Sequence, residues 1–237
     1  MSFSALAIEI RLQILSPLLV LPTPITFSAD RGPLSPPLRR LGTDEEEDKL
    51  HPSILLVSKS WHHDGSLLLF YYNTFQFPEV CTSHGSFTPD SSHIAPFIHQ
   101  IGTHARHIRH ISIPFPTLHI QIYERTPQAR SLVHEVHVEN LELLRENCES
   151  LRRLELLVPP EGNWALDCSP AAEETMDAFD VLLKSILPER EVIVNFKVYP
   201  DEKPEDSIME KIRGFGWTVR FTRLPKRTCN ASRRFST

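Results

Sequence analysis

Residues 52–77 read PSILLVSKSWHHDGSLLLFYYNTFQF, and this stretch predicts the packing around which the rest of the chain is arranged. Pro52 suits the first position of a helix. Apolar side chains then recur at helical spacing, at Ile54, Val57, Trp61, Leu68, Leu69 and Tyr72. Gly65 interrupts the pattern, so we expect one bent helix or two short ones. From Asn73 the period changes from 3.6 to 2, which predicts a short strand. A buried helix pair that leads into a strand is a scaffold without evident chemistry.

The composition indicates an ordinary soluble protein. The chain has 237 residues, of which 41% are hydrophobic and 23% are charged, enough for one large domain or two small ones. The net charge of -5 argues against a general affinity for nucleic acid. Only 8 residues are glycine, which argues against a glycine-rich loop that cradles phosphate. We therefore expect neither nucleic acid nor a small-molecule ligand as a partner.

The cysteines and the N-terminus predict an intracellular protein, in the cytoplasm, the nucleus or both. The four cysteines lie far apart and form no C-x-x-C pair: Cys81, Cys148, Cys168 and Cys229. Residues 1–20 are apolar, but Glu9, Arg11 and Gln13 interrupt them within two turns. This segment lacks a basic start and is too polar to span a bilayer. We expect reduced cysteines in the core and no membrane partner.

The first third of the chain predicts a helix, a short strand and an insert. Residues 4–15 have a broad apolar face, and Pro17 should kink or end that helix. Residues 25–28 follow two prolines and read as a strand, whose expected partner is the strand at 74–77. Residues from about 29 to 50 contain three prolines and the acidic run DEEED, and they predict a disordered insert.

The rest of the chain alternates helix and strand. The predicted helices are 93–101, 134–148, 170–187 and 205–215, and the predicted strands are 108–115, 151–158, 192–198 and 217–221. Four strands joined by three helical crossovers predict a mostly parallel sheet in an α/β fold. An irregular leucine-rich-repeat-like stack and a small three-layer α/β sheet are both options, and we favour a compact two-layer α/β body.

Three segments together resemble the F-box-like proteins common in filamentous fungi. These segments are LAIEIRLQIL at 6–15, ILLVSKSWHHDGSLLLFYYNTFQF at 54–77 and IGTHARHIRHISI at 101–113. Residues 141–157 also resemble the joint between helix and strand in F-box proteins that carry leucine-rich repeats. The resemblance divides the chain into an F-box-like helical segment at 1–78, an α/β body at 92–225 and a disordered basic tail at 226–237.

In the wider F-box family the N-terminal helices bind the Skp-type adaptor of a cullin–RING ubiquitin ligase, and the remainder captures a substrate protein. The resemblance therefore implies an adaptor-binding face on this chain, formed by Leu6, Ile8, Ile10, Ile14, Leu56, Val57 and Trp61. Three features depart from the family pattern. Ala7 replaces the usual proline, Pro17 interrupts the first helix, and an insert of about twenty residues separates the two halves.

No motif predicts catalysis or a metal site. His134 and His137 are three residues apart, whereas the H-E-x-x-H motif of zinc enzymes needs four. No nucleophile elbow, Walker motif or dinucleotide fingerprint is present. The six cationic residues after Trp217 indicate a solvated tail. We therefore expect a non-enzymatic protein-interaction protein without a cofactor. The alternatives are an F-box-like module that does not bind the adaptor and, less favoured, a cryptic hydrolase.

Overall fold

The computed structural model describes residues 6–27, 50–77, 94–116, 118–121, 130–133, 135–160 and 170–225. Its main feature is a six-stranded, entirely parallel sheet with the order β1-β2-β3-β6-β7-β8, so the strands lie in the order of the chain. These strands are β1 (Ile25–Thr26), β2 (Thr74–Gln76), β3 (His110–Pro114), β6 (Arg153–Val158), β7 (Glu191–Val198) and β8 (Thr218–Arg223). A separate antiparallel pair is formed by β4 (Leu118–Gln121) and β5 (Arg130–Val133). The predicted mixed α/β class is confirmed.

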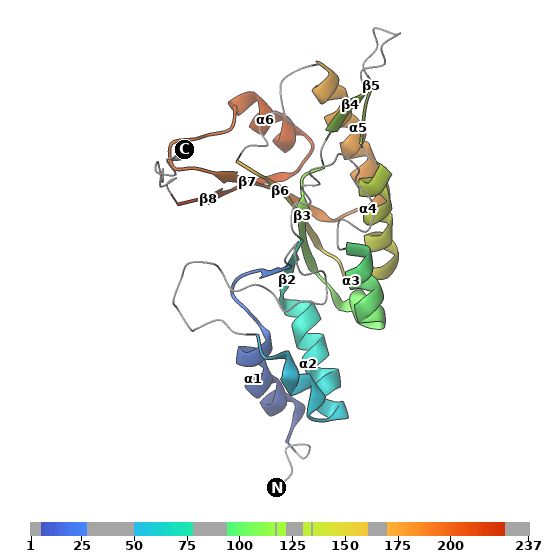
Figure 1. The fold of residues 1–237 in the computed structure, drawn as a ribbon, viewed down its shortest axis with the longest axis vertical. Helices are drawn as coiled ribbons and strands as arrows, with labels where there is room; N and C mark the ends of the chain where they lie inside the picture. The colour runs from blue at the N-terminus through green and yellow to red at the C-terminus, as the bar shows by residue number, and fades with distance from the viewer. Residues whose placement is uncertain are drawn as a thin grey trace, which may run out of the picture.

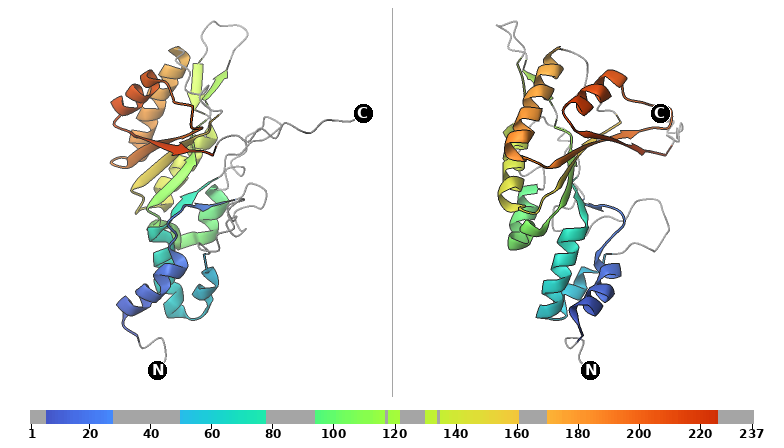
Figure 2. Two further views of the ribbon diagram at one scale, coloured as in Figure 1. Left: turned by 90° about the vertical axis from the view of Figure 1, so that its left-hand side faces the viewer. Right: turned by 180° about the vertical axis from the view of Figure 1, so that it is seen from behind.

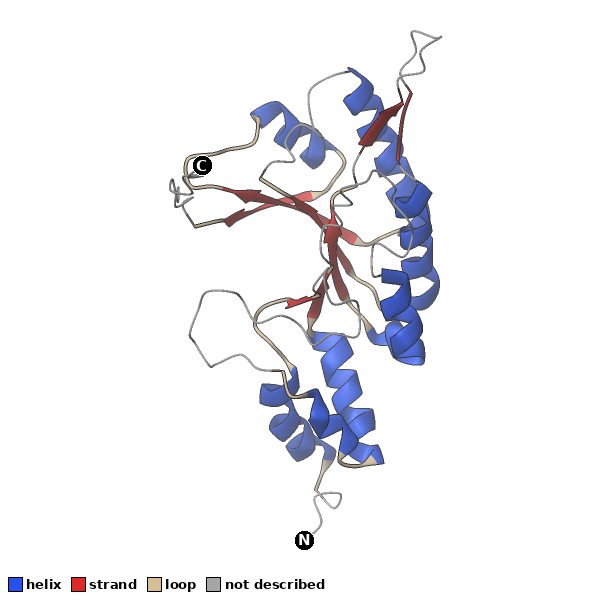
Figure 3. Ribbon diagram, in the orientation of Figure 1, coloured by secondary structure: helices blue, strands red, loops and turns tan. Residues whose placement is uncertain are grey.

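Helices cover one face of this sheet. They are α3 (Ile94–Ile101), α4 (Glu135–Asn147), α5 (Pro170–Ile186) and α6 (Asp206–Gly214), with the 3-10 helix η4 (Gly102–His107) after α3. Figures 1 and 3 show the sheet as a curved layer with these helices along its outer side. The parallel register aligns one buried row of side chains across five strands toward the helices: Ile25, Phe75, Ile111, Leu154 and Val192.

The N-terminal helices project from one end of the sheet. They are α1 (Ile8–Leu19), the 3-10 helix η2 (Pro52–Leu56) and α2 (Lys59–Tyr72), and we call them the helical unit. The start of α1 and the turn between η2 and α2 both lie at the end of this unit that points away from the sheet (Figures 1 and 2). Its C-terminal end leads through Asn73 directly into β2.

The expected pairing of the two early strands is confirmed, because Ile25 aligns with Phe75 in a parallel pair. Of the two arrangements expected for residues 52–72, the pair of short helices is found, but η2 and α2 are separated at Val57 and Ser58, and α2 continues through Gly65. A Cβ atom at this position would collide with Leu55 Cδ2 and lie 2.9 Å from Leu19 Cδ1, so glycine allows η2 and α1 to approach the backbone of α2. Close packing of α1 and η2 on α2 therefore explains why glycine stands at position 65.

Pro17 was expected to kink or end the first helix, and the second of these outcomes was wrong, because Pro17 lies inside α1, which continues to Leu19. Proline removes the hydrogen bond to the carbonyl of Gln13, but Gln13 is an exposed residue, and a backbone group that loses its partner costs less free energy at an exposed position than in the interior. The β4–β5 pair was not predicted. The predicted insert, apart from Leu50, and the predicted tail at 226–237 lie outside the described residues.

Candidate protein-binding surface

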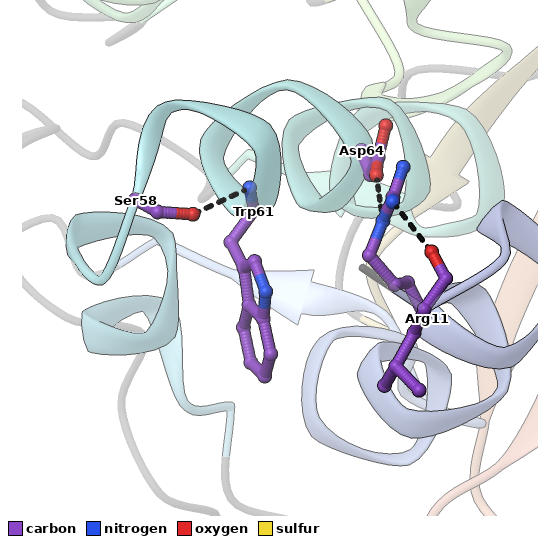
Figure 4. Close-up of polar contacts among 5 residues, drawn as sticks. Arg11, Ser58, Trp61 and Asp64 are labelled. Atoms are coloured by element: carbon purple, nitrogen blue, oxygen red, sulfur yellow. Dashed lines mark hydrogen bonds and ion pairs between the residues drawn. The ribbon is translucent and has the colours of Figure 1, made fainter. Parts of the chain in front are cut away.

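The helical unit has a small core of its own. Leu15, Leu19, Trp61 and Leu68 are buried against one another, and half-buried side chains of α1 and η2 close around them. Ser58 caps the N-terminus of α2, since its Oγ accepts a hydrogen bond from the backbone N–H of Trp61 at 3.2 Å. Figure 4 shows the indole of Trp61 directed into the space between the helices.

A buried ion pair joins the first and last helices of this unit. Arg11 Nε lies 2.8 Å from Asp64 Oδ2, and the two side chains are only 15% and 7% exposed. The Arg11 guanidinium also donates a hydrogen bond of 2.9 Å to the carbonyl of Leu6 (Figure 4). Loss of one member of such a pair leaves an uncompensated buried charge. The pair therefore specifies how α1 packs on α2.

Asn73 connects the helical unit to the sheet. Its side chain is completely buried, and its Nδ2 donates to the carbonyls of Leu19 and Leu69 at 2.7 and 2.9 Å. Its Oδ1 accepts a hydrogen bond of 2.8 Å from the backbone N–H of Leu21. One side-chain amide thus satisfies backbone groups in the last turns of α1 and α2. At this point the first helix leads toward β1 and the second toward β2.

The structure divides the seven residues of the predicted adaptor-binding face into three groups. Trp61 is 7% exposed and belongs to the core, so it does not contribute to a surface. Leu6 and Ile14 are half-buried. The remaining four are exposed: Ile8 at 48%, Ile10 at 44%, Leu56 at 84% and Val57 at 64%. Sequence periodicity could not separate these groups, because both core and docking residues are apolar.

The four exposed residues come from two elements of the helical unit, α1 and η2 with the residue that follows it. Ile8 and Ile10 lie in the first turn of α1, while Leu56 ends η2 and Val57 follows it. Both positions are at the end of the unit that points away from the sheet (Figure 2). We call this group the apolar tip. The core of the unit is closed without it, so the tip is available to a partner.

Histidines gather where α2 faces η4, but they do not form a metal centre. The rings of His62 and His104 have centroids 5.5 Å apart, and His104 stacks on Phe70. Burial, followed by the charges of neighbouring groups, lowers the pKa values of His104 and His107. Among the described residues, no group of three or more histidine, cysteine, aspartate or glutamate side chains is arranged to hold a metal ion.

Cys148 is a buried free thiol, and burial raises its pKa to about 12. Such a thiol is not ionised at neutral pH and is a poor nucleophile. The other three cysteines lie outside the described residues. The features of the helical unit that sequence reasoning missed are polar: the Arg11–Asp64 pair and the hydrogen bonds of Asn73. The Arg11–Asp64 pair and the bonds of Asn73 to Leu19 and Leu21 join residues more than fifty positions apart, which no local pattern reports.

Within the described part of the chain, no helix has the length and apolar character to cross a membrane. Comparison with known proteins gives no family model, no curated protein and no solved structure that matches this chain.

Proposed function

We propose that this chain is a non-enzymatic recruiting protein. The apolar tip of its helical unit docks a Skp-type adaptor of a cullin–RING ubiquitin ligase, and the α/β body binds the protein to be recruited. Ile8, Ile10, Leu56 and Val57 supply the affinity for the adaptor through burial of their apolar surface. Trp61 contributes indirectly, because it fills the core that holds α1 and η2 in place.

One observation carries this proposal. Four large aliphatic side chains, two in the first turn of α1 and two at the end of η2, are exposed on a helical unit whose own core is formed by Leu15, Leu19, Trp61 and Leu68. Single exposed apolar residues are common on soluble proteins, but a group drawn from two helices is typical of an interaction surface. The start of α1 lies at the end of the helical unit that points away from the sheet (Figure 1).

The arrangement of the body supports the second half of the proposal. Strands that follow one another in chain order, with helices along the outer side of a curved sheet, are typical of a leucine-rich-repeat-like stack. Such stacks present extended surfaces to partner proteins. We infer that the body of this chain is an irregular member of that class and that it acts as the capture module.

The test is binding of the purified chain to the host's Skp-type adaptor, measured by isothermal titration. We compare the wild type with an Ile8→Asp, Leu56→Asp double variant, which places two charges on the tip. The matched control is Val181→Asp, because Val181 is an aliphatic residue of α5 with 67% exposure. Burying an unpaired carboxylate at an interface should weaken binding at least about tenfold, or about 1.4 kcal/mol.

We expect the tip variant to lose adaptor binding while its circular dichroism spectrum and melting temperature stay close to those of the wild type. The Val181 control should bind as the wild type does. No binding by a folded wild type would contradict the proposal and favour an interaction module that has no adaptor. Equal loss in the tip variant and in the control would show that the tip is not the docking site.

A further inference from the structure

Arginines line the edge of the sheet where the central strands begin. Arg109, Arg152 and Arg190 each precede a strand, namely β3, β6 and β7. Their backbones are neighbours across the sheet. The N–H of Arg152 donates to the carbonyl of Arg109, and the N–H of Glu191 donates to the carbonyl of Arg152, both at 2.9 Å. Adjacent strands are about 5 Å apart, so the three residues form a short row.

Arg106 extends this row onto η4. Its carbonyl accepts a hydrogen bond of 3.1 Å from the N–H of Ser150, in the turn that leads to β6. We call Arg106, Arg109, Arg152 and Arg190 the amino-edge arginines. Arg106 and Arg152 are exposed, and the other two are half-buried. This concentration of cations lies on a chain whose net charge is -5.

None of the amino-edge arginines forms an ion pair within the described part of the chain. The Arg109 guanidinium lies over the ring of Tyr71, 4.2 Å from its centroid. Arg106 Nε donates to His107 at 3.2 Å, and Arg190 donates to the carbonyl of Glu149 at 3.4 Å. The neighbouring Arg153 differs, since it pairs with Glu191 at 2.8 Å. Among the described residues, these four guanidinium groups therefore have no carboxylate within ion-pair distance.

Burial and the charges of nearby arginines lower the pKa values of the neighbouring histidines, His107 and His110. The pKa of His107 is lowered first by burial and then by Arg106, whereas Glu149 raises it. The pKa of His110 is likewise lowered first by burial and then by Arg153 and Arg109. The imidazoles are thus held toward their neutral form beside the arginines. The positive charge of this edge resides on guanidinium groups, which stay charged at every physiological pH.

We propose that the amino-edge arginines, together with Tyr71, bind an acidic peptide segment of a partner protein, rich in aspartate and glutamate. This inference rests on the proposed function in one respect: it takes the partner that carries the acidic segment to be the protein that the α/β body recruits. A guanidinium presents a planar fork of donors that matches a carboxylate, and the Tyr71 ring offers an apolar surface beside it. Charge complementarity therefore selects a short acidic peptide.

Glutamates at the same edge disfavour nucleic acid as the occupant. Glu149, Glu189 and Glu191 lie within the turns and strand starts that carry the arginines. A nucleic acid presents a continuous row of phosphates, which these carboxylates would repel. A peptide can instead place its acidic side chains opposite the arginines and neutral ones opposite the glutamates. The experiment therefore includes an RNA, and tighter binding of that RNA than of the peptide would contradict this choice of partner.

The experiment uses the full chain and fluorescence anisotropy. The probe is a fluorescein-labelled peptide of about ten residues in which glutamate alternates with leucine, a length that suits an extended segment at a sheet edge. A glutamine counterpart of the peptide and a single-stranded RNA of similar length are the comparisons. The variant is Arg109→Gln, Arg152→Gln, Arg190→Gln. The control removes the same charge elsewhere on exposed positions: Arg213→Gln, Arg220→Gln, Arg223→Gln.

We expect the glutamate peptide to bind the wild type and the control at least about tenfold more tightly than the amino-edge variant. Binding should weaken with added salt, and the glutamine peptide should not bind. An equal loss in the control, no binding of the glutamate peptide by the folded wild type, or tighter binding of RNA would overturn the proposal.

Two further variants keep the result interpretable. Should the triple variant not fold, Arg152→Gln alone must still weaken peptide binding severalfold, because Arg152 is exposed and its side chain forms no ion pair within the described residues, so this substitution should leave the fold intact. Unchanged binding in that variant would overturn the proposal. The Ile8→Asp, Leu56→Asp variant must bind the peptide as the wild type does, since the tip and the sheet edge are separate. Failure of adaptor docking and failure of peptide binding are thereby distinguished.

Discussion

Asn73 has three hydrogen bonds in a fully buried position, and its removal tests how the helical unit is joined to the sheet. We expect Asn73→Ala to lower the free energy of unfolding by about 3 kcal/mol, because the carbonyl of Leu19 and the N–H of Leu21 lose their partner in the interior. Denaturant titration followed by circular dichroism measures this change.

The control for that substitution is Asn147→Ala. Asn147 donates one hydrogen bond, to the carbonyl of Leu143 at 2.9 Å, in a partly buried position of α4. Its loss should cost about 1 kcal/mol or less. Equal destabilisation by the two substitutions would mean that Asn73 contributes only a local hydrogen bond and does not join the elements around it.

The sequence indicated that Asn73 lies where the helical period ends, but not what its side chain does. The period change follows from Phe75 and its alternating neighbours, and the structure agrees with it. The bonds of Asn73 to Leu19 and Leu21 depend on how α1 returns to α2 in space. The same holds for Trp61, whose apolar character suited both a docking surface and a core. Whether such a residue lies in the core or at a docking surface depends on its neighbours in space. The spacing of residues along the sequence does not show which neighbours those are.

At the scale of elements, the contact between α2 and η4 should respond to pH. His104 stacks on Phe70 and faces His62, and its pKa lies below the ordinary value of 6.5 because of burial and then the charges of His62, His107, Arg106 and His63. The unfolded chain therefore binds more protons than the folded chain as the pH falls below about 6.5. Stability present above that pH is lost on acidification.

We expect the melting temperature of the wild type to fall between about pH 7.5 and about pH 5.5, and His104→Gln to reduce the dependence on pH, since the variant has one such proton site fewer. The melting curves are recorded by circular dichroism in buffers of constant ionic strength. The control is His99→Gln, an exposed histidine at the end of α3. A pH dependence that His104→Gln leaves unchanged would refute this role of His104.

Apart from β4 and β5, the helices and strands of the body were predicted with bounds closer to the structure than those of the N-terminal helix. The strand β7, for example, alternates apolar residues over eight positions, and the predicted segment 192–198 lies within it. The N-terminal helix was predicted at 4–15, whereas α1 extends to Leu19 through Pro17. Proline predicts a helix end because of a lost hydrogen bond, but solvent near Gln13 makes that loss small. Propensity rules omit such tertiary and solvent effects.

At the scale of the whole molecule, the helical unit and the α/β body share one sheet. The sequence predicted a domain boundary between residues 78 and 92. In the structure, β2 lies before that interval and β3 after it, and the two strands are hydrogen-bonded to each other. Phe75 and Phe77 pack with Phe97 of α3 in the main core, at centroid distances of 5.3 and 5.5 Å. These contacts connect the segment that resembles the F-box family with the α/β body.

This shared core predicts that the two parts unfold together. Trp61 lies in the core of the helical unit and Trp217 in the main core, so each reports on one part. We expect two single-tryptophan variants, in which phenylalanine replaces the remaining tryptophans, to give unfolding curves in urea that coincide with their own circular dichroism curves. A Trp61 transition that precedes the circular dichroism transition would mean that the helical unit opens alone. The apolar tip would then be presented by a part that is not held rigid by the sheet, and Asn73→Ala would be expected to separate the two transitions further.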